Sequence, residues 1–291
     1  MTENSDPLFL EFREQLTDSL LPGLRKGALL EGNGNVIAVL ELAGHHDEPL
    51  DVQAKATVAL SEAVRQCRVD GVLFFYPDHL SGRRMVFFDR DGTWEATCGN
   101  GLRCVTRYAS DAGLLEATGT IVTDDGPKTV RMLDGRAEVT LGRSREVQQL
   151  DDDRWFLYNG VPHLVVFVPD VSAIDVRTEG ARLRYDDGLC RALGRPEGVH
   201  VNYVQVVGDR LCVRTYEVGV EDETQCCGTG AAASAVLSRY AGRSALPVTV
   251  QTLGGELTVA ERHGEVSICG RTAYLVRPVG VRSATGSGDP R

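Results

Sequence analysis

The sequence lacks a long apolar run, an excess of basic charge and a basic-then-apolar leader. No stretch approaches the roughly 18 consecutive apolar residues of a membrane-spanning helix. The formal net charge of the 291 residues is −10, which disfavours nonspecific binding to a phosphate backbone. The opening MTENSDPLFLEF is acidic and does not fit a secretory signal. We therefore expect a cytoplasmic protein with neither a membrane nor a nucleic acid as partner.

Several ligand-binding motifs are also missing. None of the eight cysteines forms a Cys-x-x-Cys pair, which argues against a structural zinc site. The glycine-rich GNGN at residues 32–35 lacks the third glycine of a dinucleotide fingerprint, and no Gly-Lys-Ser/Thr phosphate loop occurs. We expect no metal and no cofactor. Most cysteines, Cys104 and Cys226 among them, are expected to be small buried hydrophobic residues.

Two cysteines stand apart because each begins the same short motif. The sequence contains CGNG from Cys98 and CGTG from Cys227, each followed by a run that favours a helix. Matching glycines flank both copies: Gly32 and Gly160 lie 66 and 67 residues upstream, and Gly113 and Gly242 lie 15 residues downstream. The downstream glycines sit where a helix would end. Shared landmarks at one offset of about 128 residues indicate a duplicated structural unit.

Each copy is predicted to contain strands, a cysteine-capped helix and further β-hairpins. The helices are predicted in GLRCVTRYASDAG and GAAASAVLSRYAG, and the hairpins at residues 119–142 and 246–270. The fold class is therefore α+β, with two pseudo-symmetric domains. The predicted divisions are an extension at 1–26 that contains an amphipathic helix, domains at 27–145 and 146–269, and a disordered tail at 281–291, with the boundary in the polar stretch 143–153.

A cysteine at a helix N-terminus faces the positive end of the helix dipole and unsatisfied backbone N–H groups. This environment lowers a thiol pKa and attracts an anion. If two such helices faced each other across a cleft, one thiolate could remove the α-proton of a bound carboxylate and the other thiol could return a proton to the opposite face. The helix N-termini would stabilise the carbanion. The pattern thus predicts inversion at an α-carbon without pyridoxal phosphate or metal.

The segments GNGN, ATCGNGLRC, VPH and YEVGVEDETQCCGTG together resemble diaminopimelate epimerase and its relatives, the amino-acid racemases that need no pyridoxal phosphate. The resemblance covers residues 27–280. It implies two domains, each with a β-sheet wrapped around a central helix, an active site in the interdomain cleft, and a final strand, here at 270–280, that returns to the first domain. It also implies an amino-acid substrate and a homodimer.

The resemblance assigns roles to residues at matching positions. Cys98 and Cys227 are the predicted acid and base. Asn35 is predicted to lie beside the substrate α-carbon, Glu217 to bind the ammonium, and His163 to lie near the first cysteine. The backbone N–H groups predicted to bind the α-carboxylate are those of Gly99, Asn100, Gly228 and Thr229. His163 could instead satisfy backbone groups, and Asn35 could serve its tight turn alone.

The predicted pocket for the far end of the substrate departs from the family pattern. The family's FN-x-DG is FDRDG here, its GNPH is GVPH, and its YERG is YEVG, so that Asp89, Val161 and Val218 replace two asparagines and an arginine. Of the residues that hold the second carboxylate of diaminopimelate, Asn202 alone is retained. A buried carboxylate without a cation, next to an added acid, would cost several kcal/mol. We therefore expect a basic or neutral amino acid as substrate.

Three other functions stay open. The first is diaminopimelate epimerase itself, with the second carboxylate held by other groups. The second is a noncatalytic amino-acid-binding protein, although a binder has no need of two such thiols. The third is an isomerase of a proline-like substrate, which the GVPH and YEVG segments fit less well. Asp89 could also be a simple turn residue, since Asp91-Gly92 follows it.

Overall fold

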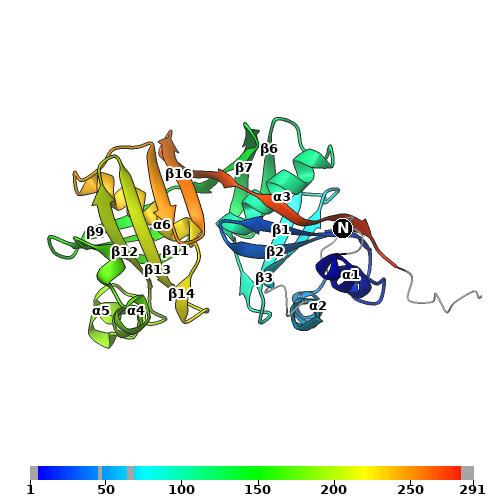
Figure 1. Cartoon of the computed structure of the whole chain (residues 1–291), viewed down its shortest axis with the longest axis horizontal. Coiled ribbons are helices and arrows are strands. Elements are labelled where there is room, and N and C mark those ends of the chain that lie inside the picture. Colours follow the sequence, from blue (N-terminus) through cyan, green and yellow to red (C-terminus); the bar gives the residue numbers. More distant parts are fainter. Residues whose placement is uncertain (1–5, 45–47, 64–68, 283–291) are drawn as a thin grey trace, which may run out of the picture. The chain divides into compact units, whose positions relative to one another are not determined.

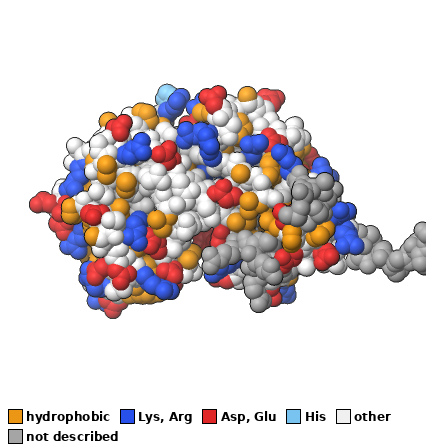
Figure 2. All heavy atoms as spheres, in the orientation of Figure 1, with side chains coloured by type: hydrophobic (Ala, Val, Ile, Leu, Met, Phe, Trp, Pro, Cys, Tyr) orange, Lys and Arg blue, Asp and Glu red, His pale blue; other side chains and the backbone are white. Residues whose placement is uncertain are grey.

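The computed structural model of the chain describes residues 6–44, 48–63 and 69–282 (Figure 1). It divides into two compact units, one of Met1–Met132 with Thr272–Arg291 and one of Leu133–Arg271. Among the described residues, no helix is both long enough and apolar enough to cross a membrane. Figure 2 shows acidic and basic side chains interspersed over the visible face of each unit.

The first unit is a mixed sheet with helices on both faces. Its elements are α1 (Pro7–Gln15), β1 (Leu24–Gly32), β2 (Asn35–Leu42), α2 (Leu50–Ala63), β3 (Val69–Tyr76), β4 (Arg84–Asp89), β5 (Trp94–Glu95), α3 (Gly99–Asp111), β6 (Thr118–Thr123), β7 (Gly126–Leu133) and β18 (Ala273–Gly280). The strand order is β18-β1-β2-β3-β4-β6-β7, in which β2–β3 and β4–β6 are parallel. The helix α3 contacts β1, β2 and β3, whereas α1 and α2 share an apolar core with strand residues such as Phe74 and Phe88.

The second unit repeats this plan. Its elements are β8 (Arg136–Gly142), β9 (Arg145–Gln149), β10 (Arg154–Asn159), β11 (Val161–Phe167), the 3₁₀ helix η3 (Val171–Ala173), α4 (Val176–Arg184), α5 (Asp187–Ala192), β12 (His200–Val207), β13 (Arg210–Glu217), β14 (Asp222–Thr224), α6 (Gly228–Tyr240), β15 (Val248–Thr252), β16 (Gly255–Arg262) and β17 (Glu265–Arg271). The strand order is β9-β10-β11-β12-β13-β15-β16-β17-β8, in which β11–β12 and β13–β15 are parallel.

The two units share one topology, which confirms the α+β class and the duplication. In each unit a helix of 13 residues follows a cysteine N-cap and ends before a glycine with positive φ, at +70° for Gly113 and +68° for Gly242. Glycine adopts this left-handed conformation without steric cost. Of the predicted hairpins, β6-β7 is present in the first unit and β15-β16-β17 in the second, whereas β8 pairs with β17.

The helix α6 lies at the centre of its unit. It contacts β10, β11, β12, β13, β15, β16 and β17, so the sheet wraps around it. Ten of its 13 residues are buried, and most of these are alanine, glycine or serine. Small side chains let the strands approach the helix from several directions at once. This packing holds the N-terminus of α6, and the cysteine that caps it, in a fixed position.

The ends of the chain extend the first unit. The helix α1 begins after Asp6, whose carboxylate accepts a hydrogen bond from the backbone N–H of Leu8 (2.8 Å), and it buries Phe9 and Phe12 in the unit's apolar core. The amphipathic helix predicted in this region is therefore present. The strand β18 pairs antiparallel with β1. From residue 283 onward, the tail that we predicted to be disordered lies outside the described residues.

The division between the units falls earlier than the predicted boundary in 143–153. The first unit ends at Met132, because β8 pairs with β17 and β9 pairs with β10, all within the second unit. The polar composition that indicated a linker belongs to β9, an edge strand with mostly exposed side chains. Polar side chains are usual on such an edge.

Candidate active site

Cys227 is the N-cap of α6. Its backbone is extended (φ −97°, ψ 109°), and its carbonyl accepts the first helical hydrogen bond, from the N–H of Ala231 at 2.9 Å. The sulfur lies 3.4 Å from the hydroxyl oxygen of Thr229, and the side chain is buried. Because a helix leaves its first N–H groups without intrahelical partners, Gly228 and Thr229 offer such groups beside the sulfur.

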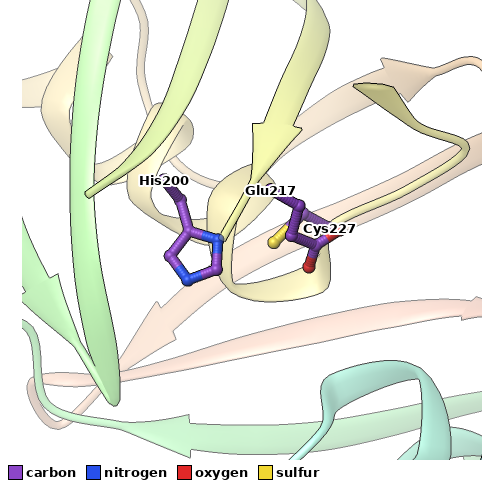
Figure 3. A group of neighbouring side chains, drawn as sticks. All are labelled: His200, Glu217 and Cys227. Carbon is purple, nitrogen blue, oxygen red and sulfur yellow. The ribbon is translucent and has the colours of Figure 1, made fainter. Parts of the chain in front are cut away.

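Two titratable side chains from neighbouring strands lie next to Cys227 (Figure 3). Glu217 is the last residue of β13, and His200 is the first residue of β12. One ligand atom of each, together with the Cys227 sulfur, lies within 4.8 Å of the other two. The backbone N–H of Val218 donates to Nδ1 of His200 (3.3 Å), which fixes the orientation of the ring. Of the described residues, these three form the one group of His, Cys and acidic side chains close enough to hold a metal ion.

The electrostatics of this group correct one expectation. We expected the helix N-terminus to lower the pKa of both thiols. Burial instead raises the pKa of the Cys227 thiol well above its usual range, and the negative charge of Glu217 raises it further. Burial also lowers the pKa of His200 to about 4, with a further contribution from the positive charge of Arg184. His200 is therefore a neutral imidazole near pH 7, and desolvation outweighs the helix dipole at Cys227.

Asn202 and His163 are the buried neighbours of this group: the His163 ring lies against the His200 ring, and Asn202 contacts His163. Both are fully buried. The Asn202 amide contacts Nδ1 of His163 (3.2 Å) and donates to the carbonyl of Leu164 (3.0 Å), while its oxygen accepts from the Thr215 hydroxyl (3.0 Å). The ring centroids of His163 and His200 are 5.0 Å apart, and burial followed by the charge of His200 lowers the pKa of His163 well below its usual range. Asn202, which we predicted to contact the substrate, thus has its amide engaged within the unit.

In the first unit, Cys98 caps α3 in the same way. Its backbone is extended (φ −137°, ψ 119°), its sulfur accepts from the N–H of Gly101 at 3.4 Å, and its carbonyl accepts from Leu102 at 2.8 Å. The side chain is half-buried, and the residue that follows it, Gly99, is buried. The predicted cysteine N-caps are therefore present in both motifs, and each places a sulfur at the first turn of a central helix.

A buried arginine fixes the first turn of α3. The Arg103 side chain is fully buried; its Nη1 donates to Oδ1 of Asn33 (2.7 Å) and its Nη2 donates to Oδ1 of Asn100 (2.5 Å). Asn100 is itself buried. These bonds join the GNGN turn to the CGNG motif. A charged donor that bonds two amide oxygens holds both segments in one geometry.

The GNGN segment is a two-residue hairpin turn. Asn33 (φ +53°) and Gly34 (φ +83°) connect β1 to β2, and Gly32 pairs with Asn35 across the turn. Asn-Gly with positive φ at both positions is the preferred two-residue hairpin connection. Asn35 is half-buried as the first residue of β2. Its predicted contact with a substrate α-carbon stays a prediction.

Asp89 occupies in the first unit the place that Glu217 has in the second. Each is the half-buried last residue of a strand, followed by a short strand and then by the cysteine-capped helix. Asp89 also takes part in a turn, since its N–H donates to Thr93 (2.9 Å) and its carbonyl accepts from Gly92 (2.9 Å). The turn interpretation therefore describes its backbone, and its carboxylate still lies at a strand end near the motif.

The two valines of the predicted distal pocket lie in the second unit. Val161 begins β11, and Val218 follows β13; both are half-buried. The turn after Val218 is held by Glu221, whose carboxylate is 3.2 Å from Nη2 of Arg184 and accepts from the hydroxyl of Tyr185 at 2.9 Å. The carboxylate of Glu221 is thus engaged within the protein.

Sequence reasoning missed His200 and Arg103. His200 lies two residues before Asn202 on a strand, and since alternate strand residues share a face, this spacing was the signal that could have placed it beside the helix. Arg103 lies four residues after Gly99 inside a helix, and a helical arginine is usually exposed. No sequence signal distinguishes it from a surface residue, so its burial is a result of the fold.

Comparisons with known proteins identify relatives of this chain. The family model described as diaminopimelate epimerase matches residues 155–272, which lie within the second unit except for the last residue. The chain is 34% identical over 255 residues to the diaminopimelate epimerase of Methanocella arvoryzae, which covers 79% of this chain and 88% of the relative. A second diaminopimelate epimerase, from Flavobacterium psychrophilum, is 30% identical over 236 residues, with the same two coverages.

Solved structures show the same fold at lower sequence identity. A proline racemase assigned as probable, from Agrobacterium radiobacter, superposes with a TM-score of 0.63 at 18% identity over 89% of this chain and 93% of the other. These comparisons confirm the two-domain architecture and the class of enzyme predicted from the sequence, an isomerase of the racemase and epimerase type. Each unit has a central helix capped by a cysteine, and the chain matches the two epimerases over nearly nine-tenths of their own length. The chain belongs to the diaminopimelate epimerase family.

Proposed function

We propose that the protein inverts the α-carbon of an amino acid by a two-base mechanism in which Cys98 and Cys227 act without a cofactor. The observation that carries this proposal is the duplicated N-cap: each unit presents one cysteine sulfur at the first turn of a buried helix. A structural thiol has no reason to occur at this one position in both copies. A two-base inversion needs one sulfur for each face of the substrate.

The chemistry balances without any other reactant. One sulfur, as thiolate, takes the α-hydrogen as a proton, and the electron pair of the broken C–H bond delocalises into the substrate carboxylate. The other sulfur, as thiol, delivers its proton to the opposite face and becomes the thiolate. Backbone N–H groups of Gly99, Asn100, Gly228 and Thr229 would hold the carboxylate as its negative charge grows. Fixed donors aimed at a developing charge lower the barrier because they need no reorganisation.

Glu217 is the proposed partner of the substrate ammonium. It is half-buried, and a carboxylate oxygen lies within 4.8 Å of the Cys227 sulfur, so an ammonium bound there would lie next to the α-carbon at which this sulfur transfers a proton. A buried ammonium needs a carboxylate to offset its desolvation. The substrate would also neutralise the negative charge that Glu217 brings close to the thiol.

The surroundings of His200 support a substrate without a distal carboxylate. His200 is neutral, and aliphatic Val161 and Val218 take the places of the family's asparagine and arginine. Arg184, whose charge acts on His200, is paired with Glu221 (3.2 Å) and donates to the carbonyl of Glu197 (2.6 Å). A substrate carboxylate would have to displace these partners. We therefore propose a basic or neutral amino acid as substrate.

Diaminopimelate is the second candidate substrate. The observation in its favour is the 34% identity to a diaminopimelate epimerase over 88% of that protein's length. If it is the substrate, the distal carboxylate must bind groups other than those the family uses. Exchange of the α-hydrogen, measured separately with each candidate substrate, decides between the two.

The test is exchange of the α-hydrogen in D₂O. The reduced protein is incubated without pyridoxal phosphate with single L-amino acids and with diaminopimelate, and the α-proton signal is followed by NMR. Exchange with a basic or neutral amino acid, absent for diaminopimelate, is expected. Exchange with diaminopimelate alone would refute the proposed substrate class and leave the mechanism standing.

Single cysteine variants make the same experiment a test of mechanism. Cys98→Ser and Cys227→Ser are each expected to stop racemisation, whereas Cys269→Ser, which changes a half-buried thiol on β17, serves as the matched control. Full racemisation in either motif variant would exclude the two-thiol mechanism. Binding of the substrate without any exchange in the unmodified protein would support the noncatalytic alternative.

A further inference from the structure

His200, Glu217 and Cys227 form a group of three different donor atoms that the proposed reaction uses only in part. They come from the start of β12, the end of β13 and the N-cap of α6, and they converge in one place (Figure 3). Their donor atoms all lie within 4.8 Å of one another. The proposed mechanism gives roles to Glu217 and Cys227 and none to the imidazole beside them.

An imidazole nitrogen, a carboxylate oxygen and a sulfur are the donors that Zn²⁺ prefers, and three protein ligands with one open position are typical of an exchangeable zinc site. Zinc bonds of about 2.0–2.3 Å place tetrahedral ligand atoms roughly 3.3–3.8 Å apart. The 4.8 Å limit within which the three donor atoms lie includes this range.

The neighbours of the three ligands form an outer shell. Thr229 lies 3.4 Å from the Cys227 sulfur, and the His163 ring lies against the His200 ring with centroids 5.0 Å apart. Such contacts orient metal ligands. The N–H of Val218 bonds Nδ1 of His200 at 3.3 Å, which is at the long end for this type of bond. A metal that binds Nδ1 would replace this bond.

We propose that His200, Glu217 and Cys227 bind a thiophilic divalent cation such as Zn²⁺ in the substrate-free protein. As the Zn–S bond forms, the thiol proton leaves to solvent. The ion with one thiolate and one carboxylate is then electrically neutral, which suits a buried site. The proposed inversion needs no metal. A bound ion would inhibit it, because the ion occupies Glu217, the proposed partner of the substrate ammonium, and Cys227, which transfers the proton. This last step rests on the proposed function.

The binding test uses Co²⁺ as a coloured probe that takes zinc sites. The full chain is reduced, treated with a chelator, freed of it and titrated with Co²⁺. One ion per chain is expected, with a sulfur-to-cobalt charge-transfer band and the strong visible absorption of tetrahedral Co²⁺, both abolished by added Zn²⁺. Absence of the charge-transfer band would overturn the proposal, and so would its persistence in Cys227→Ser.

Two histidine variants identify the nitrogen ligand. His200→Asn is expected to weaken Zn²⁺ binding by about tenfold or more, since even loss of an outer-shell contact costs 10–100-fold. His263→Asn is the matched control: it removes an exposed imidazole of the same unit at φ +54°, a conformation that asparagine tolerates. Equal affinities in the two variants would refute the assignment of His200. Circular dichroism of both variants verifies that each is folded.

The competition arm separates this inference from the proposed function. If the protein exchanges α-hydrogens, Zn²⁺ is expected to inhibit competitively with the amino acid, and the inhibition is expected to weaken in His200→Asn. Zinc binding without inhibition would refute the mutual exclusion and leave the site in place. A protein that binds Co²⁺ as described but exchanges no amino acid would refute the proposed function alone.

Discussion

Replacement of Gly230 by alanine is expected to destabilise the second unit, although alanine is the better helix former. A Cβ atom at this position would lie 2.2 Å from Oδ1 of Asn202 and 3.2 Å from Cβ of Cys227. Asn202 is fully buried and cannot rotate away without losing its bond to the carbonyl of Leu164. The substitution therefore displaces the Asn202 amide, which contacts His163 next to the candidate site.

The magnitude follows from three contributions. Overpacking costs about 1–3 kcal/mol, and a buried amide that loses its partners costs about 1–3 kcal/mol. Alanine in a helix regains about 0.5–1 kcal/mol. The net destabilisation is expected to be about 3 kcal/mol. The equivalent glycine of α3, Gly101, meets only side-chain carbons at 3.1–3.3 Å, so Gly101→Ala is expected to cost less.

The assay is urea unfolding, followed in each unit separately. The protein has two tryptophans, Trp94 in the first unit and Trp155 in the second. With Trp94→Phe as background, the fluorescence of Trp155 reports the second unit alone. The Gly230→Ala variant is expected to shift this transition to lower urea with an unchanged slope.

A double-mutant cycle tests the stated cause. In an Asn202→Ala background the clashing oxygen is gone, and the further cost of Gly230→Ala is expected to fall below about 1 kcal/mol. An equal cost in both backgrounds would show that contact with Asn202 is not the reason, and a stabilised Gly230→Ala single variant would refute the packing described for this helix.

Four further outcomes are expected. Cys98→Ser and Cys227→Ser should each lower racemisation by about 10²–10⁴-fold with ligand binding retained, as measured by polarimetry and calorimetry; full racemisation in either variant would refute a two-base role. Mild oxidation should abolish turnover and a thiol reductant should restore it, and preparations that stay fully active when oxidised would contradict a mechanism that needs both thiols. The double change Val161→Asn with Val218→Arg should raise kcat/KM for diaminopimelate by about tenfold or more, because it restores a cation and an amide for a carboxylate; no gain would exclude these positions from the distal pocket. Phe12→Ala should destabilise the first unit by about 3–5 kcal/mol, seen in the tryptophan fluorescence of that unit, and an unaffected transition would show that α1 is not part of its core.

Local signals in the sequence were enough to predict much of the fold. The Asn-Gly turn at residues 33–34 needs positive φ at both positions, and Gly113 and Gly242 end their helices in the left-handed conformation. These are properties of single residues and their immediate neighbours. Repeated at one offset, they made the duplication and the two cysteine N-caps predictable without knowledge of any long-range contact.

The domain boundary was not predictable in this way. The polar composition of residues 143–153 is that of a linker and equally that of an edge strand. Only the pairing of β8 with β17 and of β9 with β10 assigns these residues to the second unit. The pairing of β8 with β17 joins segments more than 100 residues apart, so composition near the boundary carries no information about it.

The sequence by itself determined the family and the two sulfur positions, because these depend on motifs read along the chain. Tertiary structure alone decided that His200 lies with Glu217 and Cys227, that Arg103 within α3 is buried, and that the pKa of the Cys227 thiol is raised. The first two depend on which strands and turns meet around a central helix. The third depends on desolvation and on a charge brought close by the fold, and both outweigh the dipole of the helix that the motif begins.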